Sequence, residues 1–175
     1  MKLKELVYAA IFAAITAVLA QITIPMPGGV PFTLQTFAVI LAGLVLGYKF
    51  GALSSLIYVL LALVGLPVLS GMRGGPAAVF GLTGGFTLTF PLLSLIAGLG
   101  KNAKKWNRLF FIIAGVFVNY MAGTAWFSVV GERTFVESLT VCVLPFVITD
   151  AIKIVAAWLV ADVLCKALSK AGLLA

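Results

Sequence analysis

A pair of opposite charges inside an apolar stretch constrains this chain more than any other feature. Asp150 and Lys153 lie near the middle of residues 138–166, a run apolar enough to span a membrane. About 20 Å of helix separates each charge from the polar residue at its own end of the run, Glu137 or Lys166. The pair therefore falls near the centre of a hydrocarbon layer about 30 Å thick. Charges at that depth are costly and face a bundle interior or a cavity.

The spacing of the pair allows two interpretations. Side chains three residues apart share one helix face, so Asp150 and Lys153 can pair with each other. They form either a structural ion pair that fixes this helix to its neighbours or part of a polar ligand site within the membrane. We favour the ligand site and interpret the rest of the chain with it in view.

The composition indicates a polytopic membrane protein. Of the 175 residues, 63% are hydrophobic and 10% are charged, which no soluble domain of this size matches. We predict an all-α membrane protein, a six-transmembrane-helix bundle with structured external loops, as a single integral membrane domain over residues 1–175. The predicted spans cover residues 6–24, 34–47, 52–69, 86–99, 109–130 and 138–166. Pro145 predicts a kink in the last span.

Two connections are too rich in glycine or proline to be ordinary loops. Residues 25–33 hold three prolines and two glycines, which excludes a continuous helix and indicates a structured connection, with a lid as one option. Residues 70–85 are glycine-rich, with one arginine, Arg73, and no polar run. Non-helical backbone at membrane depth is tolerated where it lines a cavity. We interpret this stretch as cavity lining; a flexible surface connection is the alternative.

The basic residues predict the orientation. Nine of the 12 lie on one side of the predicted bundle, namely Lys2, Lys4, Lys49, Lys101, Lys104, Lys105, Arg108, Lys166 and Lys170. Only Arg73 and Arg133 lie on the other side. Basic loops stay in the cytoplasm, so both termini are predicted to be cytoplasmic and the pocket opens outward. This distribution also explains the net charge of +7 without nucleic acid as a partner.

The residue inventory speaks against an enzyme. The chain has no histidine, no P-loop and no cluster suited to a metal, so we predict no catalytic residue, no metal and no cofactor. Cys142 and Cys165 are 23 residues apart on one predicted helix, about 35 Å, and cannot bond to each other.

Four motifs, at residues 31–36, 66–75, 81–86 and 150–153, follow one another in an order and spacing that resembles the BioY family. This family comprises the biotin-binding S components of energy-coupling factor (ECF) vitamin transporters. The resemblance implies a six-helix bundle in the cell membrane of a prokaryote, high-affinity biotin binding and uptake, and a membrane-embedded T component with two ATPase subunits as partners. Leu82 departs from the family pattern, in which proline is commoner.

The polar groups of the motifs and of the predicted pocket suit biotin. The ligand-binding residues that we predict are Gln35, Arg73, Gly74, Thr83, Asn119, Tyr120, Asp150 and Lys153. Arg73 or Lys153, with backbone N–H groups at Gly74 and Gly75, suits a carboxylate. Asp150 can accept from the ureido N–H groups, and Asn119 or Lys153 can donate to the ureido carbonyl. The sequence leaves open which end of biotin meets which group, and whether Asn119 only bridges helices.

Small residues on the first span suggest where a partner docks. Ala9, Ala13 and Ala17 form a ridge that permits close helix approach in lipid, so we predict a partner-docking surface there. Packing against the chain's own helices is the alternative.

Two other functions compete with ligand capture. An ion- or proton-coupled carrier of a small carboxylated solute would use Asp150 alone, and the neighbouring Lys153 weakens that case. An intramembrane hydrolase would need a second catalytic group near Asp150, and none is evident.

The orientation is testable by single-cysteine labelling in a protein that lacks Cys142 and Cys165. Because basic loops remain in the cytoplasm, Ala103→Cys should react only from the cytoplasmic side and Pro76→Cys only from outside. Labelling of both positions from the same side would contradict the six-span topology.

Overall fold

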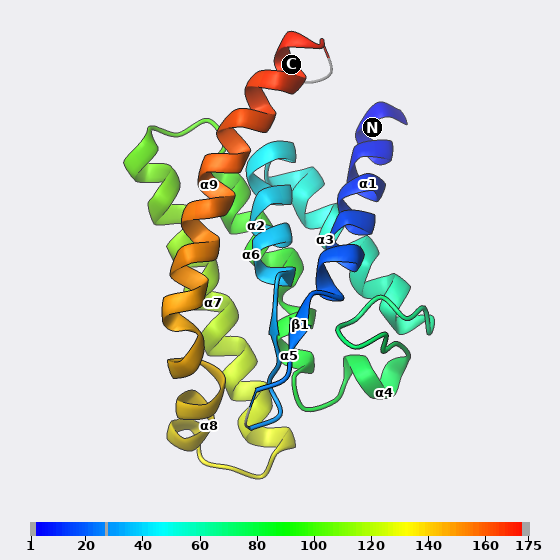
Figure 1. Cartoon of the computed structure of the whole chain (residues 1–175), viewed down its shortest axis with the longest axis vertical. Coiled ribbons are helices and arrows are strands. Elements are labelled where there is room, and N and C mark those ends of the chain that lie inside the picture. The colour runs from blue at the N-terminus through cyan, green and yellow to red at the C-terminus, as the bar shows by residue number, and fades with distance from the viewer. Residues whose placement is uncertain (1–2, 27, 173–175) are drawn as a thin grey trace.

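The chain folds into a bundle of helices that run along one long axis (Figure 1). The computed structural model describes residues 3–26 and 28–172. The first helix begins and the last helix ends at the same end of the bundle (Figure 1). There the Lys4 ammonium donates to the Gly172 carbonyl at 3.1 Å.

The described part of the chain consists of long helices, short helices and one pair of short strands. In chain order they are α1 (Leu3–Ala20), β1 (Thr23–Ile24), β2 (Phe32–Thr33), α2 (Gln35–Leu46), α3 (Tyr48–Leu63), α4 (Pro76–Val79), α5 (Gly84–Leu88), α6 (Phe90–Leu99), α7 (Lys105–Val130), α8 (Phe135–Cys142), the 3-10 helix η1 (Leu144–Phe146) and α9 (Val147–Lys170). Within this described part, α1, α7 and the α8–α9 stretch are long and apolar enough to cross a membrane, and α2, α3 and α6 are shorter apolar helices.

Helix α2 forms the centre of the bundle. It contacts α1, α3, α6 and α9, and every residue at positions 38–46 is buried. At 1.5 Å per residue its 12 residues cover about 18 Å, less than a hydrocarbon layer. Because the neighbouring helices surround it, α2 does not have to match the thickness of the lipid.

Glycines bring α2, α3 and α6 into backbone contact. A Cβ added to Gly43 would lie 2.4 Å from the Ser94 carbonyl oxygen, and one added to Gly98 would lie 2.5 Å from the Tyr48 nitrogen. A Cβ on Gly51 would lie 2.6 Å from the Gly43 α-carbon. No side chain larger than hydrogen fits at these positions, so glycine is what allows the three helices to pack this closely.

Several predicted segments differ from the structure in detail. The third span, predicted over residues 52–69, is α3 (Tyr48–Leu63) and ends six residues earlier. The first span ends at Ala20, before residues 23–24 and 32–33 pair as an antiparallel hairpin. The described residues of the predicted connection, 25–26 and 28–33, are non-helical, as predicted. The fourth span is broken at Thr89 into α5 and α6, with Pro91 in the first turn of α6. The kink expected at Pro145 is a break, because η1 separates α8 from α9.

The predicted docking ridge on α1 is wrong for Ala9 and Ala13. Their exposed fractions are 0% and 1%, because this face of α1 packs on α2 and α3 of the same chain. Ala17 is half-buried against the same core. The four-residue spacing of the alanines correctly placed them on one face of α1, but helices of the same chain cover that face. The neighbouring alanines, Ala10 and Ala14, are exposed.

Candidate functional site

A cavity of about 90 Å³ lies between the hairpin, the connection before α4, and helices α2, α7 and α9. Seven of the eight predicted ligand-binding residues line it: Gln35, Arg73, Thr83, Asn119, Tyr120, Asp150 and Lys153. The eighth, Gly74, does not. Segments that are up to 118 residues apart, counted from Gln35 to Lys153, thus contribute to one polar cavity.

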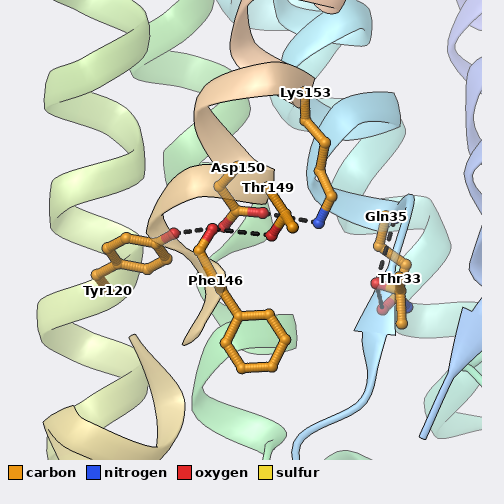
Figure 2. Close-up of polar contacts among 7 residues, drawn as sticks. All are labelled: Thr33, Gln35, Tyr120, Phe146, Thr149, Asp150 and Lys153. Carbon is orange, nitrogen blue, oxygen red and sulfur yellow. Dashed lines mark hydrogen bonds and ion pairs between the residues drawn. The ribbon is translucent and has the colours of Figure 1, made fainter. Parts of the chain in front are cut away.

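The charged pair forms the buried floor of this cavity. Asp150 and Lys153 are each 5% exposed, and the Lys153 ammonium donates to Asp150 Oδ1 at 2.7 Å. The Tyr120 hydroxyl donates to Asp150 Oδ2, so the carboxylate lies between a cation and a hydroxyl (Figure 2). A buried ion pair is tolerated only with such additional hydrogen bonds, because desolvation of both charges is costly.

Lys153 also contacts the hairpin. Its ammonium lies 4.1 Å from the centre of the Phe32 ring, within the range of a cation–π interaction. Phe32 belongs to β2, so this contact joins the hairpin to α9 directly above the charged pair.

Asn119 bridges helices through both of its amide hydrogens. Its Nδ2 donates to the Phe86 carbonyl at 2.9 Å and to the Thr89 hydroxyl at 2.7 Å. These acceptors lie in α5 and at the break between α5 and α6, so α7 supports the irregular backbone there. Since both hydrogens are used, the group that Asn119 can still offer to a ligand is its carbonyl oxygen, an acceptor.

A chain of hydrogen bonds connects the hairpin with the connection that carries Arg73. The Thr33 hydroxyl donates to Gln35 Oε1 at 3.0 Å, and Gln35 Nε2 donates to the Tyr58 hydroxyl. The Tyr58 hydroxyl donates to the Val68 carbonyl at 3.0 Å. Tyr58 was not predicted as part of the site. A tyrosine within an apolar span needs a hydrogen-bond partner, and that requirement is the signal that could have identified it.

Arg73 stands on a tight turn at the edge of the cavity. Its Nε donates to the Ser70 carbonyl at 3.0 Å and its Nη2 approaches the Ser70 hydroxyl at 3.4 Å, which orients the guanidinium. Arg73 is exposed, in contrast to the buried pair on the floor.

The predicted backbone cradle for an anion is contradicted at Gly75. A Cβ on Gly74 would lie 2.2 Å from the Leu66 carbonyl oxygen, so this glycine permits close packing of the connection on itself. The Gly75 N–H donates to the Ala62 carbonyl at 2.7 Å and is unavailable to a ligand. The Arg73 guanidinium, which lines the cavity, therefore remains the predicted anion-binding group of this stretch.

Some cavity-lining residues were absent from the prediction. Ser70, Phe90, Cys142 and Phe146 line the cavity. Phe146 lies four residues before Asp150, one helical turn away, and that spacing is a signal that could have identified it. Cys142 and Phe90 carry no comparable signal, because the breaks near Pro145 and Thr89 turn them inward.

A second hollow lies behind the charged pair. It is an apolar groove of about 370 Å³ between α7 and α9, with Phe117 and Val155 among its walls. Tyr120 and Asp150 line this groove as well as the polar cavity, so their hydrogen bond forms part of the partition between the two spaces.

Together these features define a multi-pass helical membrane protein with a buried ion pair in a polar cavity covered by loops at one end of the bundle. Within the described residues, no three His, Cys, Asp or Glu side chains cluster as a metal site. The chain belongs to the BioY family, whose sequence profile matches residues 1–170.

The relatives and a solved structure agree with this membership. The chain is 43% identical to the probable biotin transporter BioY of Pyrococcus horikoshii over 93% of this chain and 96% of that protein. It is 37% identical to the biotin transporter BioY of Thermotoga maritima over 91% and 94% of the two chains. It is also similar to a crystal structure of the S-component for biotin from an ECF-type ABC transporter. That match has a TM-score of 0.86 and 29% identity, and it covers 93% of this chain and 91% of the other.

The charged pair generates the first structural test. Lys153→Ala leaves Asp150 buried without its cation, a change that costs about 3–5 kcal/mol, so the variant should melt well below the parent protein in detergent. Lys166→Ala removes an exposed lysine of the same helix and should leave the melting temperature unchanged.

A double substitution checks the interpretation of that result. Replacing both charges, Asp150→Leu with Lys153→Met, removes the unpaired ion and should recover much of the lost thermal stability. If Lys153→Ala melts like the parent, the pair does not carry the role assigned to it.

Proposed function

We propose that this chain binds biotin at the outer face of the cell membrane and serves as the substrate-capture subunit of an ECF-type transporter. The observation that carries the proposal is the arrangement of one exposed guanidinium above one buried ion pair in a single cavity. Family membership and the names of the relatives support biotin as the ligand.

The two kinds of polar group suit the two ends of biotin. Arg73, at the exposed edge, is placed to bind the carboxylate at the end of the aliphatic tail. At depth, Lys153 can donate to the ureido carbonyl, while Asp150 and the Asn119 amide oxygen can accept from the ureido N–H groups. Phe86 and Phe90 line the space between and would cover the apolar ring and tail.

Ligand entry requires movement at the mouth of the cavity. Its volume of about 90 Å³ is well below the roughly 300 Å³ at which ligand pockets begin. The hairpin and the connection before α4 are the elements above the floor, so we assign the opening movement to them.

The membrane topology that accompanies this function has six spans. Three are the long stretches α1, α7 and α8–α9, and the other three are built on α2, α3 and α5–α6. Figure 1 supports this path, because both termini, the α2–α3 turn and the α6–α7 loop lie at one end of the bundle. The hairpin and the α7–α8 turn lie at the other end. The lysine-rich end is then cytoplasmic and the cavity opens outward, in a prokaryotic cell membrane.

A stand-alone proton-coupled carrier is the less favoured function. Such a carrier needs a carboxylate that gains and loses its proton during transport. Asp150 is held by the Lys153 ammonium and the Tyr120 hydroxyl at once, so a proton arriving there has to displace an ion pair.

The partners are a membrane-embedded T component and two ATPase subunits, which would supply the energy that a chain without a nucleotide-binding loop lacks. Docking in lipid needs close backbone approach at small residues. Ala9 and Ala13 are buried, so they are not available to a partner. We propose instead that the partner docks at the exposed pair Ala10 and Ala14, which lie one turn apart on the adjacent face of α1.

Calorimetry with biotin on the purified protein tests the capture function. The parent protein should bind tightly, and Arg73→Ala should weaken binding by about ten- to a hundredfold while the bundle stays folded, because a hydrogen bond to a charged group contributes about 1.5–3 kcal/mol. Arg133→Ala removes the other arginine of the same predicted side and should bind like the parent. Unchanged affinity in Arg73→Ala would show that the carboxylate is held elsewhere.

Two tryptophan substitutions on α1 test the docking surface. Ala14→Trp adds bulk on the exposed face and should prevent co-purification with the T component while biotin binding by the isolated protein persists. Ala13→Trp adds the same bulk inside the bundle and should lower thermal stability without any partner present. If Ala14→Trp still assembles, docking uses another face.

A further inference from the structure

One polar side chain at the end of α1 reaches across to the turn that carries Arg73. Gln21 Nε2 donates to the Leu69 carbonyl at 3.1 Å and to the Val68 carbonyl at 3.3 Å. Gln21 Oε1 accepts from the Met72 backbone N–H at 3.0 Å. A single side chain thus contacts both the start of the turn and the residue directly before Arg73.

The turn itself has an unfavourable backbone. Two backbone hydrogen bonds close it. The Leu69 N–H donates to the Arg73 carbonyl at 2.9 Å, and the Arg73 N–H donates to the Leu69 carbonyl at 3.4 Å. Between them, Gly71 and Met72 adopt φ values of +71° and +56°. A left-handed backbone is uncommon for a residue other than glycine, so the conformation at Met72 needs support from its surroundings.

Gln21 provides that support from outside the cavity. Its side chain is half-buried and is not part of the cavity lining. The Val68 carbonyl also accepts from Tyr58, which secures the start of the turn. The Met72 N–H, by contrast, is held by Gln21, so the Arg73 end of the turn depends on α1.

We propose that Gln21 is a positioning residue for Arg73. Its amide fixes the turn in the conformation that places the guanidinium at the edge of the cavity, and it makes the end of α1 part of the ligand site without touching the ligand. The inference rests on the proposed role of Arg73 in binding the ligand carboxylate.

The first experiment measures the turn directly, with no ligand. A nitroxide label is attached to a cysteine introduced by Met72→Cys, which retains the backbone N–H at position 72. The same protein carries Cys142→Ser and Cys165→Ala, so that no other cysteine reacts. Adding Gln21→Met, a side chain of similar length without hydrogen bonds, should increase the mobility of the label. Val18→Met, on the exposed face of the same helix, should leave the spectrum unchanged. An unchanged spectrum with Gln21→Met overturns the proposal.

The second experiment separates positioning from a general loss of structure. Gln21→Met should weaken biotin binding by about tenfold, the equivalent of losing one to two hydrogen bonds, with the melting temperature close to that of the parent. With biotinamide, which lacks the carboxylate that Arg73 binds, the same substitution should change the affinity by less than about twofold, because the charge-assisted contact that Gln21 positions is absent.

The outcomes distinguish this inference from the proposed function. Equal weakening of biotin and biotinamide binding, or no weakening of either, overturns the role of Gln21 and leaves biotin capture standing. Failure of the parent protein to bind biotin overturns the proposed function itself, and the first titration detects that before any variant is compared.

Discussion

Burial of the Asp150–Lys153 pair is the constraint on which the rest of the site depends. Two charges within a hydrocarbon layer are stable only when their partners are fixed in place, since water cannot compensate a poor contact there. The Tyr120 hydroxyl from α7 and the Phe32 ring from the hairpin both meet this pair on α9. The requirement to satisfy one ion pair therefore brings three separate parts of the chain together and leaves a polar cavity between them.

The bundle divides this task between two kinds of packing. Helices α2, α3 and α6 touch through glycines with their backbones in contact, so they form a close-packed support. The parts above the ion pair are short strands, turns and helices of four or five residues, held by individual hydrogen bonds such as those of Tyr58 and Gln21. A rigid support beneath a loosely held cover suits a protein that must admit a ligand and still bind it tightly.

Local sequence rules predicted what depends on spacing along the chain. The contact between Asp150 and Lys153 followed from their i,i+3 separation, and proline chemistry predicted a kink at Pro145, where the helix in fact breaks. The contacts of Gln21 with the turn could not be predicted in this way, because they join residues 47 to 51 positions apart and depend on how α1 meets the turn. The alanine ridge shows the same limit: periodicity places Ala9 and Ala13 on one face, and only the packed bundle shows that this face is covered.

The partition between the polar cavity and the apolar groove has a consequence for handling the protein outside its membrane. Tyr120 and Asp150 face both spaces, so an alkyl chain seated in the groove between α7 and α9 lies directly behind the floor of the ligand site. An amphiphile that occupies the groove is then separated from the ligand site by little more than the Tyr120–Asp150 hydrogen bond and the side chains around it. Ligand affinities of this protein and its variants are therefore comparable only when they are measured in the same detergent.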